Sequence, residues 1–220
     1  MTPRERRSLV ALAIATLVPF ILLAAWARVA SPAPWEPAVL DALALGQDLP
    51  GDVVRAINTL GNLPVWAVVV GILAVAIGAT RGLISGLAVA LSFASDIAAA
   101  VVKIIVERER PETVAVEHFI GPDSFAFPSG HVVRAVALAA ICGWIVAPPR
   151  WRLQAALGTG FAAGLVMGYA RVALNVHWPT DALGGLLLGL GWLVVTAWLL
   201  ARRMATDPAT GGRSEQSRPA

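Results

Sequence analysis

Six long apolar stretches constrain the fold of this chain more than any other feature of its sequence. Each is continuous and rich in Ala, Leu and Gly, and a helix needs about 20 such residues to cross the hydrocarbon core of a membrane. A membrane β-barrel would instead show segments of about ten residues with alternating polarity. The sequence therefore predicts an all-α fold, a polytopic membrane bundle of six transmembrane helices. The stretches are Ser8–Trp26, Pro64–Ala79, Leu83–Val106, His131–Ala147, Leu153–Tyr169 and Asp181–Ala201.

The composition supports an integral membrane protein. Of the 220 residues, 57% are hydrophobic and 14% are charged, whereas a soluble domain has about 25% charged residues. We expect one six-helix domain over residues 1–204 and a polar, disordered cytoplasmic tail over residues 205–220. Arg4–Arg7 and the following apolar run also resemble a cleavable signal peptide, but the run is longer than the usual core of about 7–15 residues. An uncleaved anchor is the favoured interpretation.

The distribution of basic residues predicts the orientation. With both termini in the cytoplasm, ten of the 17 basic residues lie on the inner side, as positively charged cytoplasmic loops require. This excess suits contact with anionic lipids, and no nucleic-acid partner is expected. We predict a bacterial inner (cell) membrane protein, and the sequence leaves its oligomeric state open. The ten residues are Arg4, Arg6, Arg7, Arg81, Arg150, Arg152, Arg202, Arg203, Arg213 and Arg218.

The connection over residues 29–63 predicts two short helices that cap the bundle, with lipid gating as an alternative role. The first covers Ala38–Leu45 with Pro37 in its first turn. The second covers Asp52–Leu60, and Val53, Val54, Ile57 and Leu60 share one helical face.

Glycines recur every four residues in the last two apolar stretches. Small residues at this spacing allow helix backbones to approach closely in a membrane, so we interpret them as packing faces. Cys142 is the single cysteine, so an intramolecular disulfide is impossible. The glycines are Gly160, Gly164, Gly168, Gly185 and Gly189.

The first cluster of polar residues contains the only lysine of the chain. Lys103 lies in an apolar stretch and is followed seven residues later by Arg110 and then by Pro111. Seven residues are two helical turns, so we expect both cations on one face, about 10 Å apart along the axis. Pro111 disfavours a helical conformation at Arg110. A snorkelling lysine or a local ion pair with Glu107 is the alternative to a functional site.

The second cluster is Pro128-Ser129-Gly130-His131, at the start of the fourth stretch. Ser129 is the expected helix N-cap. Free N–H donors at a helix N-terminus suit a phosphate, and Gly130 allows close approach to the backbone. An ordinary cap beside an interfacial histidine is the alternative.

The third cluster precedes and opens the last stretch. Arg171 is followed by His177 and then by Asp181, with Pro179 fitting the first turn of the helix. An acidic group so placed can accept a hydrogen bond from one imidazole nitrogen and leave the other nitrogen with its lone pair. Arg171 adds a permanently charged fork for phosphoryl oxygens.

Together the three clusters resemble the type 2 phosphatidic acid phosphatase superfamily, whose members share K-x6-RP, PSGH and SR-x5-H-x3-D in this order. The match runs from Lys103 to Asp181 with every charged and imidazole position present. Ala170 stands where the family pattern often has Ser, which removes one hydroxyl donor. The resemblance also implies that the three clusters meet at the outer helix ends.

By this resemblance, His177 is the nucleophile that forms a phosphohistidine, Asp181 orients it, and His131 protonates the leaving group. The expected activity is a metal-independent lipid phosphate or diphosphate phosphatase at the exoplasmic surface, without a cofactor. Undecaprenyl diphosphate, phosphatidic acid and phosphatidylglycerophosphate all fit as substrates. A phosphotransferase of the same superfamily, a transporter and a scaffold with a degraded site are the alternatives. The residues expected to hold the phosphoryl oxygens are Lys103, Arg110, Ser129, Gly130 and Arg171.

Two further charges lie inside apolar stretches and are not required by the family pattern. Asp96 lies two turns before Lys103, and Arg134 lies one turn after His131. Intramembrane charges usually pair, so we predict an Asp96–Arg134 ion pair that supports the floor of the pocket. Snorkelling of Arg134, or contact with the second phosphate of a diphosphate, is the alternative.

Overall fold

The computed structural model describes residues 3–30, 32–44, 49–111 and 124–205, and within these ranges every regular element is helical. The all-α prediction is confirmed. Apart from Ala205, the predicted polar tail lies outside the described residues. The α-helices are α1 Pro3–Val29, α2 Glu36–Leu43, α3 Leu49–Leu60, α4 Leu63–Arg81, α5 Leu83–Ala90, α6 Ser95–Val106, α7 Gly130–Val146, α8 Arg152–Ala173 and α9 Pro179–Ala205.

Five helical segments of the described chain are long and apolar enough to cross a membrane. The fourth predicted stretch forms α7, which is apolar but has only 17 residues. The chain is therefore an integral membrane protein. The five segments are Glu5–Val29, Leu63–Arg81, Leu83–Val106, Pro149–Ala173 and Pro179–Leu200.

The third predicted stretch is continuous in sequence but not a single α-helix. A short 3-10 helix, η1 (Leu91–Ala94), separates α5 from α6. The hydroxyl of Ser95 donates to the carbonyl of Ser92 at 2.6 Å, and the Trp192 indole donates to the carbonyl of Leu91 at 3.2 Å. Side-chain donors of this kind compete with the regular helical ladder and explain the local change in winding.

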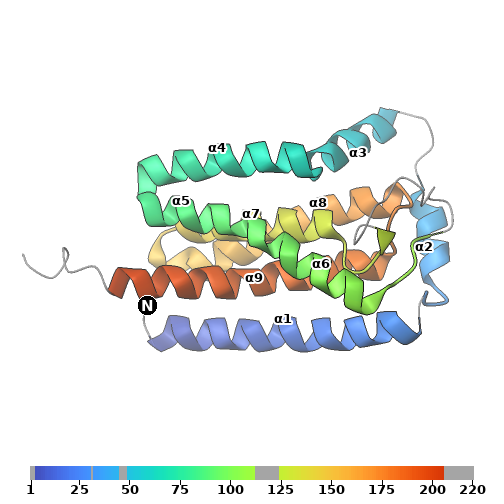
Figure 1. The fold of residues 1–220 in the computed structure, drawn as a ribbon, viewed down its shortest axis with the longest axis horizontal. Helices are drawn as coiled ribbons and strands as arrows, with labels where there is room; N and C mark the ends of the chain where they lie inside the picture. Colours follow the sequence, from blue (N-terminus) through green and yellow to red (C-terminus); the bar gives the residue numbers. More distant parts are fainter. Residues whose placement is uncertain (1–2, 31, 45–48, 112–123, 206–220) are drawn as a thin grey trace, which may run out of the picture.

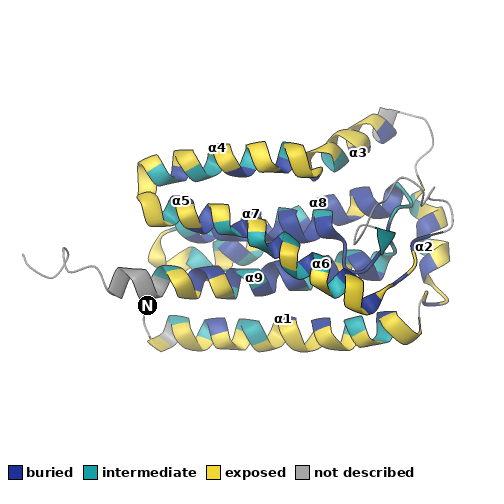
Figure 2. Cartoon of the chain, in the orientation of Figure 1, coloured by how far each residue is buried: buried dark blue, intermediate teal, exposed yellow. Residues whose placement is uncertain are grey.

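Helix α7 forms the centre of the bundle, with α8 and α9 packed against it (Figure 1). Figure 2 shows α7 largely buried, whereas α1 and α4 expose long faces to the surroundings. A Cβ added at Gly189 of α9 would lie only 2.6 Å from Cβ of Val136, and one at Gly185 would lie 2.8 Å from Cβ of Val132. On α8, a Cβ at Gly164 would lie 3.0 Å from Val136. The glycine faces therefore allow the close packing that the sequence predicts.

Two short helices occupy the predicted connection at one end of the bundle. Helix α2 begins at Glu36, two residues earlier than expected, and Pro37 lies in its first turn as predicted. Helix α3 packs against α8, where Val54 is buried beside Ala170. On the predicted apolar face of α3, Val54 is buried, whereas Val53 and Leu60 are 58% and 55% exposed. Val54 and Ile57 pack against neighbouring residues, so this part of the face is covered by the bundle.

Candidate active site

The three sequence clusters lie at the same end of the bundle. Lys103 occupies the last turn of α6, Ser129 caps α7, and Arg171 occupies the last turn of α8. All three residues are buried, as are Arg110, His177 and Asp181. A Cβ at Gly130 would lie 4.0 Å from the Lys103 side chain, so the second cluster directly adjoins the first.

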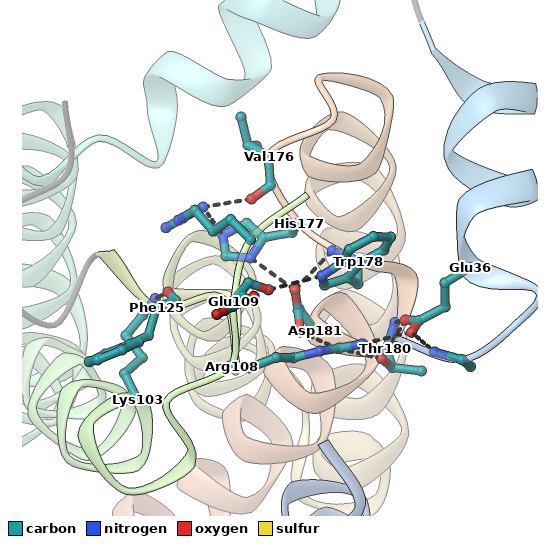
Figure 3. A network of polar contacts seen from close by, with 12 residues as sticks. Glu36, Lys103, Arg108, Glu109, Phe125, Val176, His177, Trp178, Thr180 and Asp181 are labelled. Carbon is teal, nitrogen blue, oxygen red and sulfur yellow. Dashed lines mark hydrogen bonds and ion pairs between the residues drawn. The ribbon is translucent and has the colours of Figure 1, made fainter. Parts of the chain in front are cut away.

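His177 lies in the turn between α8 and α9 and is 1% exposed. Its Nδ1 is 3.4 Å from Oδ2 of Asp181, which also accepts a hydrogen bond from the backbone N–H of Trp178 at 2.8 Å (Figure 3). Its Nε2 is 3.3 Å from Nη1 of Arg110. One imidazole nitrogen therefore faces a carboxylate, and the other faces a cation.

The surroundings of His177 favour its neutral form. Burial is the largest cause that lowers its pKa well below the usual value, and the positive charges of Arg110, Arg171 and Lys103 lower this pKa further. With the Nδ1–H donated to Asp181, the neutral ring keeps its lone pair on Nε2. That nitrogen is the one beside Arg110, so its lone pair faces a cation.

Arg110 reaches the site by a different route from the one the sequence predicts. Helix α6 ends at Val106, and Glu107 adopts a left-handed conformation with φ 51°. Lys103 and Arg110 therefore do not share a helical face. The segment after the helix instead places Arg110 so that its Nη1 donates to the carbonyl of Val176 at 2.6 Å.

Lys103 and Arg171 are held by polar groups of neighbouring segments. Nζ of Lys103 donates to the carbonyl of Phe125 at 2.6 Å, and Arg171 donates to the side-chain oxygen of Asn58 on α3. Glu107, the alternative partner considered for Lys103, forms an exposed ion pair with Arg28 at 3.2 Å.

Ser129 occupies the predicted N-cap position of α7, but its side chain makes no capping hydrogen bond. Ser129 has an extended backbone conformation, and its N–H donates to the carbonyl of Asp181 at 3.0 Å. Among the described residues, its buried hydroxyl has no hydrogen-bond partner. The Nε2–H of His131 donates to Oδ1 of Asn62 at 3.1 Å. The site therefore combines an unused hydroxyl and a helix N-terminus with several cations, which is the chemistry that binds a phosphate.

A comparison with known protein families finds a match of residues 81–205 to the PAP2 superfamily. The chain belongs to the PAP2 superfamily. This membership confirms the resemblance inferred from the three clusters, since the matched region contains all of them.

The sequence is also similar to individual phosphatases. Phosphatidylglycerophosphatase B of Escherichia coli is 35% identical over 98 residues, covering 44% of this chain and 38% of that protein. An undecaprenyl-diphosphatase of Sulfolobus acidocaldarius is 32% identical over 72 residues, covering 33% of this chain and 32% of that protein. The chain thus spans well under half of the length of these relatives.

A solved structure matches over more of the chain. The crystal structure of a transmembrane PAP2-type phosphatidylglycerolphosphate phosphatase from Bacillus subtilis has a TM-score of 0.68 at 25% identity. The match covers 89% of this chain and 98% of that one. The fold described above is therefore that of a transmembrane PAP2 protein.

No sequence pattern singles out Arg108 and Glu36, which join the candidate site through Asp181. Both side chains are almost completely buried, and Arg108 bonds to Glu36 at 2.6 Å and to Asp181 at 2.5 Å. Arg108 lies between Lys103 and Arg110 in the sequence, but only the structure shows that it is buried. Glu36 lies more than 140 residues before Asp181, and no sequence pattern links the two.

A second missed element is the corner between α3 and α4, where Asn58 and Asn62 contact Arg171 and His131. The backbone carbonyl of Gly61 in this corner accepts a hydrogen bond from Arg134 at 2.6 Å.

The structure contains the Asp96–Arg134 ion pair, with Nε of Arg134 2.7 Å from Oδ1 of Asp96. Within the described ranges, no group of three or more His, Cys, Asp or Glu side chains is arranged to hold a metal ion.

Proposed function

We propose that this PAP2 protein hydrolyses lipid phosphates or diphosphates through a phosphohistidine on His177. The observation that carries the proposal is the environment of that residue: a buried imidazole with Asp181 at one nitrogen and Arg110 at the other. Phosphoryl transfer depends mainly on positioning and on stabilising charge at the phosphoryl oxygens. A neutral histidine surrounded by cations supplies both.

The reaction would proceed in two steps. In the first, Nε2 of His177 attacks phosphorus, the bond from phosphorus to the leaving oxygen breaks, and His131 gives that oxygen a proton. In the second, water attacks the phosphohistidine and passes a proton to His131, and the phosphorus–nitrogen bond breaks to release inorganic phosphate. The oxygens of the transferred group would be held by Lys103, Arg110, Arg171, the Ser129 hydroxyl and the Gly130 amide.

Asp181 would act on His177 rather than on the substrate. Its Oδ2 lies beside Nδ1 of the imidazole, so the carboxylate accepts the Nδ1–H and stabilises the positive charge that develops as the phosphohistidine forms. Groups of this kind determine the tautomer of a reacting histidine.

The proposed substrate has its tail in the bilayer and its phosphate at the membrane surface. The site lies at one end of the helices that cross the membrane, where such a phosphate would be found. Phosphatidylglycerophosphate, phosphatidic acid and undecaprenyl diphosphate share this chemistry. The names of the relatives include a phosphatidylglycerophosphatase and an undecaprenyl-diphosphatase, so monophosphates and diphosphates both belong in the test.

We further propose that α7 is a sixth membrane crossing and that the site faces the exoplasmic side of a bacterial inner membrane. Helix α7 has 17 residues, the lower limit of about 17 for a spanning helix. It begins at the site and packs against both α8 and α9, which belong to segments long enough to cross a membrane. The excess of arginines at the opposite end supports this orientation.

The decisive assay is phosphate release by the purified protein from a panel of lipid phosphates with EDTA present. Hydrolysis in EDTA would support a metal-independent phosphatase, and loss of activity that added Mg²⁺ restores would contradict it. A parallel reaction with a lipid alcohol as acceptor distinguishes hydrolysis from phosphoryl transfer to another lipid.

The nucleophile proposal predicts that His177→Ala abolishes turnover. Removing one member of such a catalytic set typically costs about three to six orders of magnitude in rate. The unfolding midpoint of the variant in detergent serves as the fold control. Retention of more than about a tenth of wild-type phosphate release by a folded His177→Ala protein would contradict the proposal.

A further inference from the structure

A buried polar network connects the outer helix α2 to Asp181. Arg108 donates through Nη1 to Oδ1 of Asp181 at 2.5 Å and to the Thr180 hydroxyl at 2.6 Å. Its Nη2 donates to Oε2 of Glu36 at 2.6 Å. Oε1 of Glu36 in turn accepts the Thr180 hydroxyl at 2.6 Å (Figure 3).

The network divides the two oxygens of the Asp181 carboxylate between different partners. Oδ1 accepts from Arg108, whereas Oδ2 accepts from the Trp178 N–H and lies beside Nδ1 of His177. A carboxylate held at both oxygens cannot rotate freely about its terminal bond. The orientation of the carboxylate toward the imidazole is therefore restrained by Arg108 at one oxygen and by the Trp178 N–H at the other.

Arg108 is itself held tightly. Its guanidinium lies 5.5 Å from the ring centroid of Trp26 and 5.8 Å from that of Trp178. Its planar fork suits two carboxylates at once, which a lysine ammonium cannot match in geometry. Glu36 is 0% exposed, and its Oε2 also accepts the backbone N–H of Ala33 at 2.8 Å.

A buried ion-pair network of this kind is not required for stability alone. Desolvation of the charges offsets much of their attraction, and apolar residues of similar volume often serve as well. Its contact with the residue that orients the histidine suggests a role in the reaction.

We propose that Arg108 is a positioning residue: anchored by Glu36 on α2, it fixes the Asp181 carboxylate so that the carboxylate orients the Nδ1–H of His177. This inference rests on the proposed role of His177 as the nucleophile. No contact of Arg108 with the substrate is needed, because it acts only through Asp181.

The test is a double-mutant cycle on the purified full chain, with Arg108→Met, Asp181→Asn and the double variant. Arg108→Met should lower kcat about 10- to 100-fold, by analogy with the loss caused by removing a hydrogen-bond partner of a metal-ligating histidine, with KM little changed. On the Asp181→Asn background, the same substitution should cause no further loss, because coupled residues are not additive.

Two further variants complete the cycle. Glu36→Gln keeps the side-chain shape, so it should fold even where Arg108→Met does not, and it should lower kcat in the same direction. Glu107→Gln is the matched control: its carboxylate is on the same segment as Arg108 but is exposed and paired with Arg28. We expect its kcat to be unchanged.

A second measurement does not depend on turnover. The chain has three histidines, so ¹⁵N NMR of histidine-labelled protein can resolve the imidazole tautomers, with His177→Asn assigning one set of signals. Wild type should carry the His177 proton on Nδ1, and Arg108→Met or Glu36→Gln should shift it toward a mixture.

The outcomes separate the two proposals. Additive kcat losses in the cycle, or a His177 tautomer unchanged in both variants, would overturn the positioning role. A wild-type protein that releases phosphate from none of the lipids would overturn the proposed function instead. In that case the tautomer measurement alone decides whether Arg108 orients His177 through Asp181.

Discussion

At the scale of single residues, His177 lies beside a carboxylate and among several cations. It is buried beside a carboxylate, yet Arg110, Arg171 and Lys103 contribute more positive charge than Asp181 balances. The cations that would bind a phosphate therefore also keep the histidine uncharged. In the proposed mechanism, the same charges would both bind the substrate phosphate and keep the nucleophile uncharged.

This environment predicts how stability depends on pH. The pKa of His177 in the folded protein is lowered, with burial as the first cause, whereas an unfolded histidine has a pKa of about 6.5. Between these two values the unfolded chain binds a proton that the folded chain does not. The contribution of His177 to the free energy of unfolding is therefore complete above about pH 6.5 and is lost as the pH falls from there toward the lower pKa of the folded state.

The corresponding measurement is the unfolding midpoint in detergent at pH 7.5 and at pH 5, for wild type and for His177→Asn. The asparagine variant should lose less stability on acidification, because it lacks the titrating ring. An identical acid shift in the two proteins would show that His177 does not contribute to it. Its neighbours Asp181 and His131 remain in both proteins, so their contributions cancel in the comparison.

The Asp96–Arg134 pair provides a second prediction at this scale. Both side chains are mostly buried, and Arg134 also donates to the carbonyl of Gly61. Asp96→Leu or Arg134→Leu leaves one charge unpaired and should cost about 3–5 kcal/mol, whereas the double leucine variant should recover much of the loss. The exposed Asp52–Arg55 pair is the matched control, with an expected effect of about 0–1 kcal/mol.

Thermal unfolding of the four proteins in detergent measures this coupling. Purely additive losses would exclude a supporting ion pair. If Arg134→Leu instead selectively lost hydrolysis of diphosphates over monophosphates, Arg134 would contact the second phosphate of the substrate.

At the scale of secondary-structure elements, the corner between α3 and α4 is closely fitted to the site. Asn58 contacts Arg171, and Asn62 contacts His131. A Cβ at Gly61 would lie 2.3 Å from Cδ2 of His131. The absence of a side chain at this position is therefore what allows the histidine to occupy its place.

Gly61→Ala should consequently displace His131 and lower phosphate release at least about tenfold, within the range that loss of general acid catalysis causes. Gly71→Ala in α4 is the control, since a Cβ there meets nothing within 4 Å and alanine favours a helix. Equal activity of the two variants would show that His131 tolerates the movement or is not the general acid.

The sequence predicts the helices and the residues of the three clusters because both depend on local patterns. Continuous apolar runs define the spans, and Ser129 and Pro179 mark helix starts through capping and ring geometry. The apolar stretch Leu83–Val106 ends where α6 ends, but the predicted shared helical face of Lys103 and Arg110 is wrong, because Glu107 adopts a left-handed conformation that glutamate does not signal. The contact of Glu36 with Arg108 depends on the tertiary fold, and no local pattern reveals such a pairing.

At the scale of the whole molecule, the charged side chains of the candidate site lie near one end of the helical bundle. The buried basic side chains of the candidate site lie at the ends of α6 and α8, near the start of α7. A transporter would require polar groups along the full depth of the bundle. The central part of α7, from Val136 to Ile141, is instead apolar and buried. This arrangement favours a reaction at one membrane surface over passage through the membrane.

The proposed orientation can be tested by cysteine labelling in intact cells on a Cys142→Ala background, since Cys142 is the only native cysteine. Asp41 is exposed on α2 at the site end, and Arg150 is exposed between α7 and α8 at the opposite end. With the site on the exoplasmic side, Asp41→Cys should react with a membrane-impermeant reagent in intact cells. Arg150→Cys should react only after the membrane is permeabilised.

Both variants should label equally in detergent, which controls for intrinsic reactivity. The reverse pattern in cells would place the phosphate site in the cytoplasm. The substrates would then be lipids whose phosphates face the cytoplasm, and the arginines at the opposite end would violate the charge bias that orients most membrane proteins. Because the site lies at one end of the helices, this single measurement determines which leaflet presents the substrate.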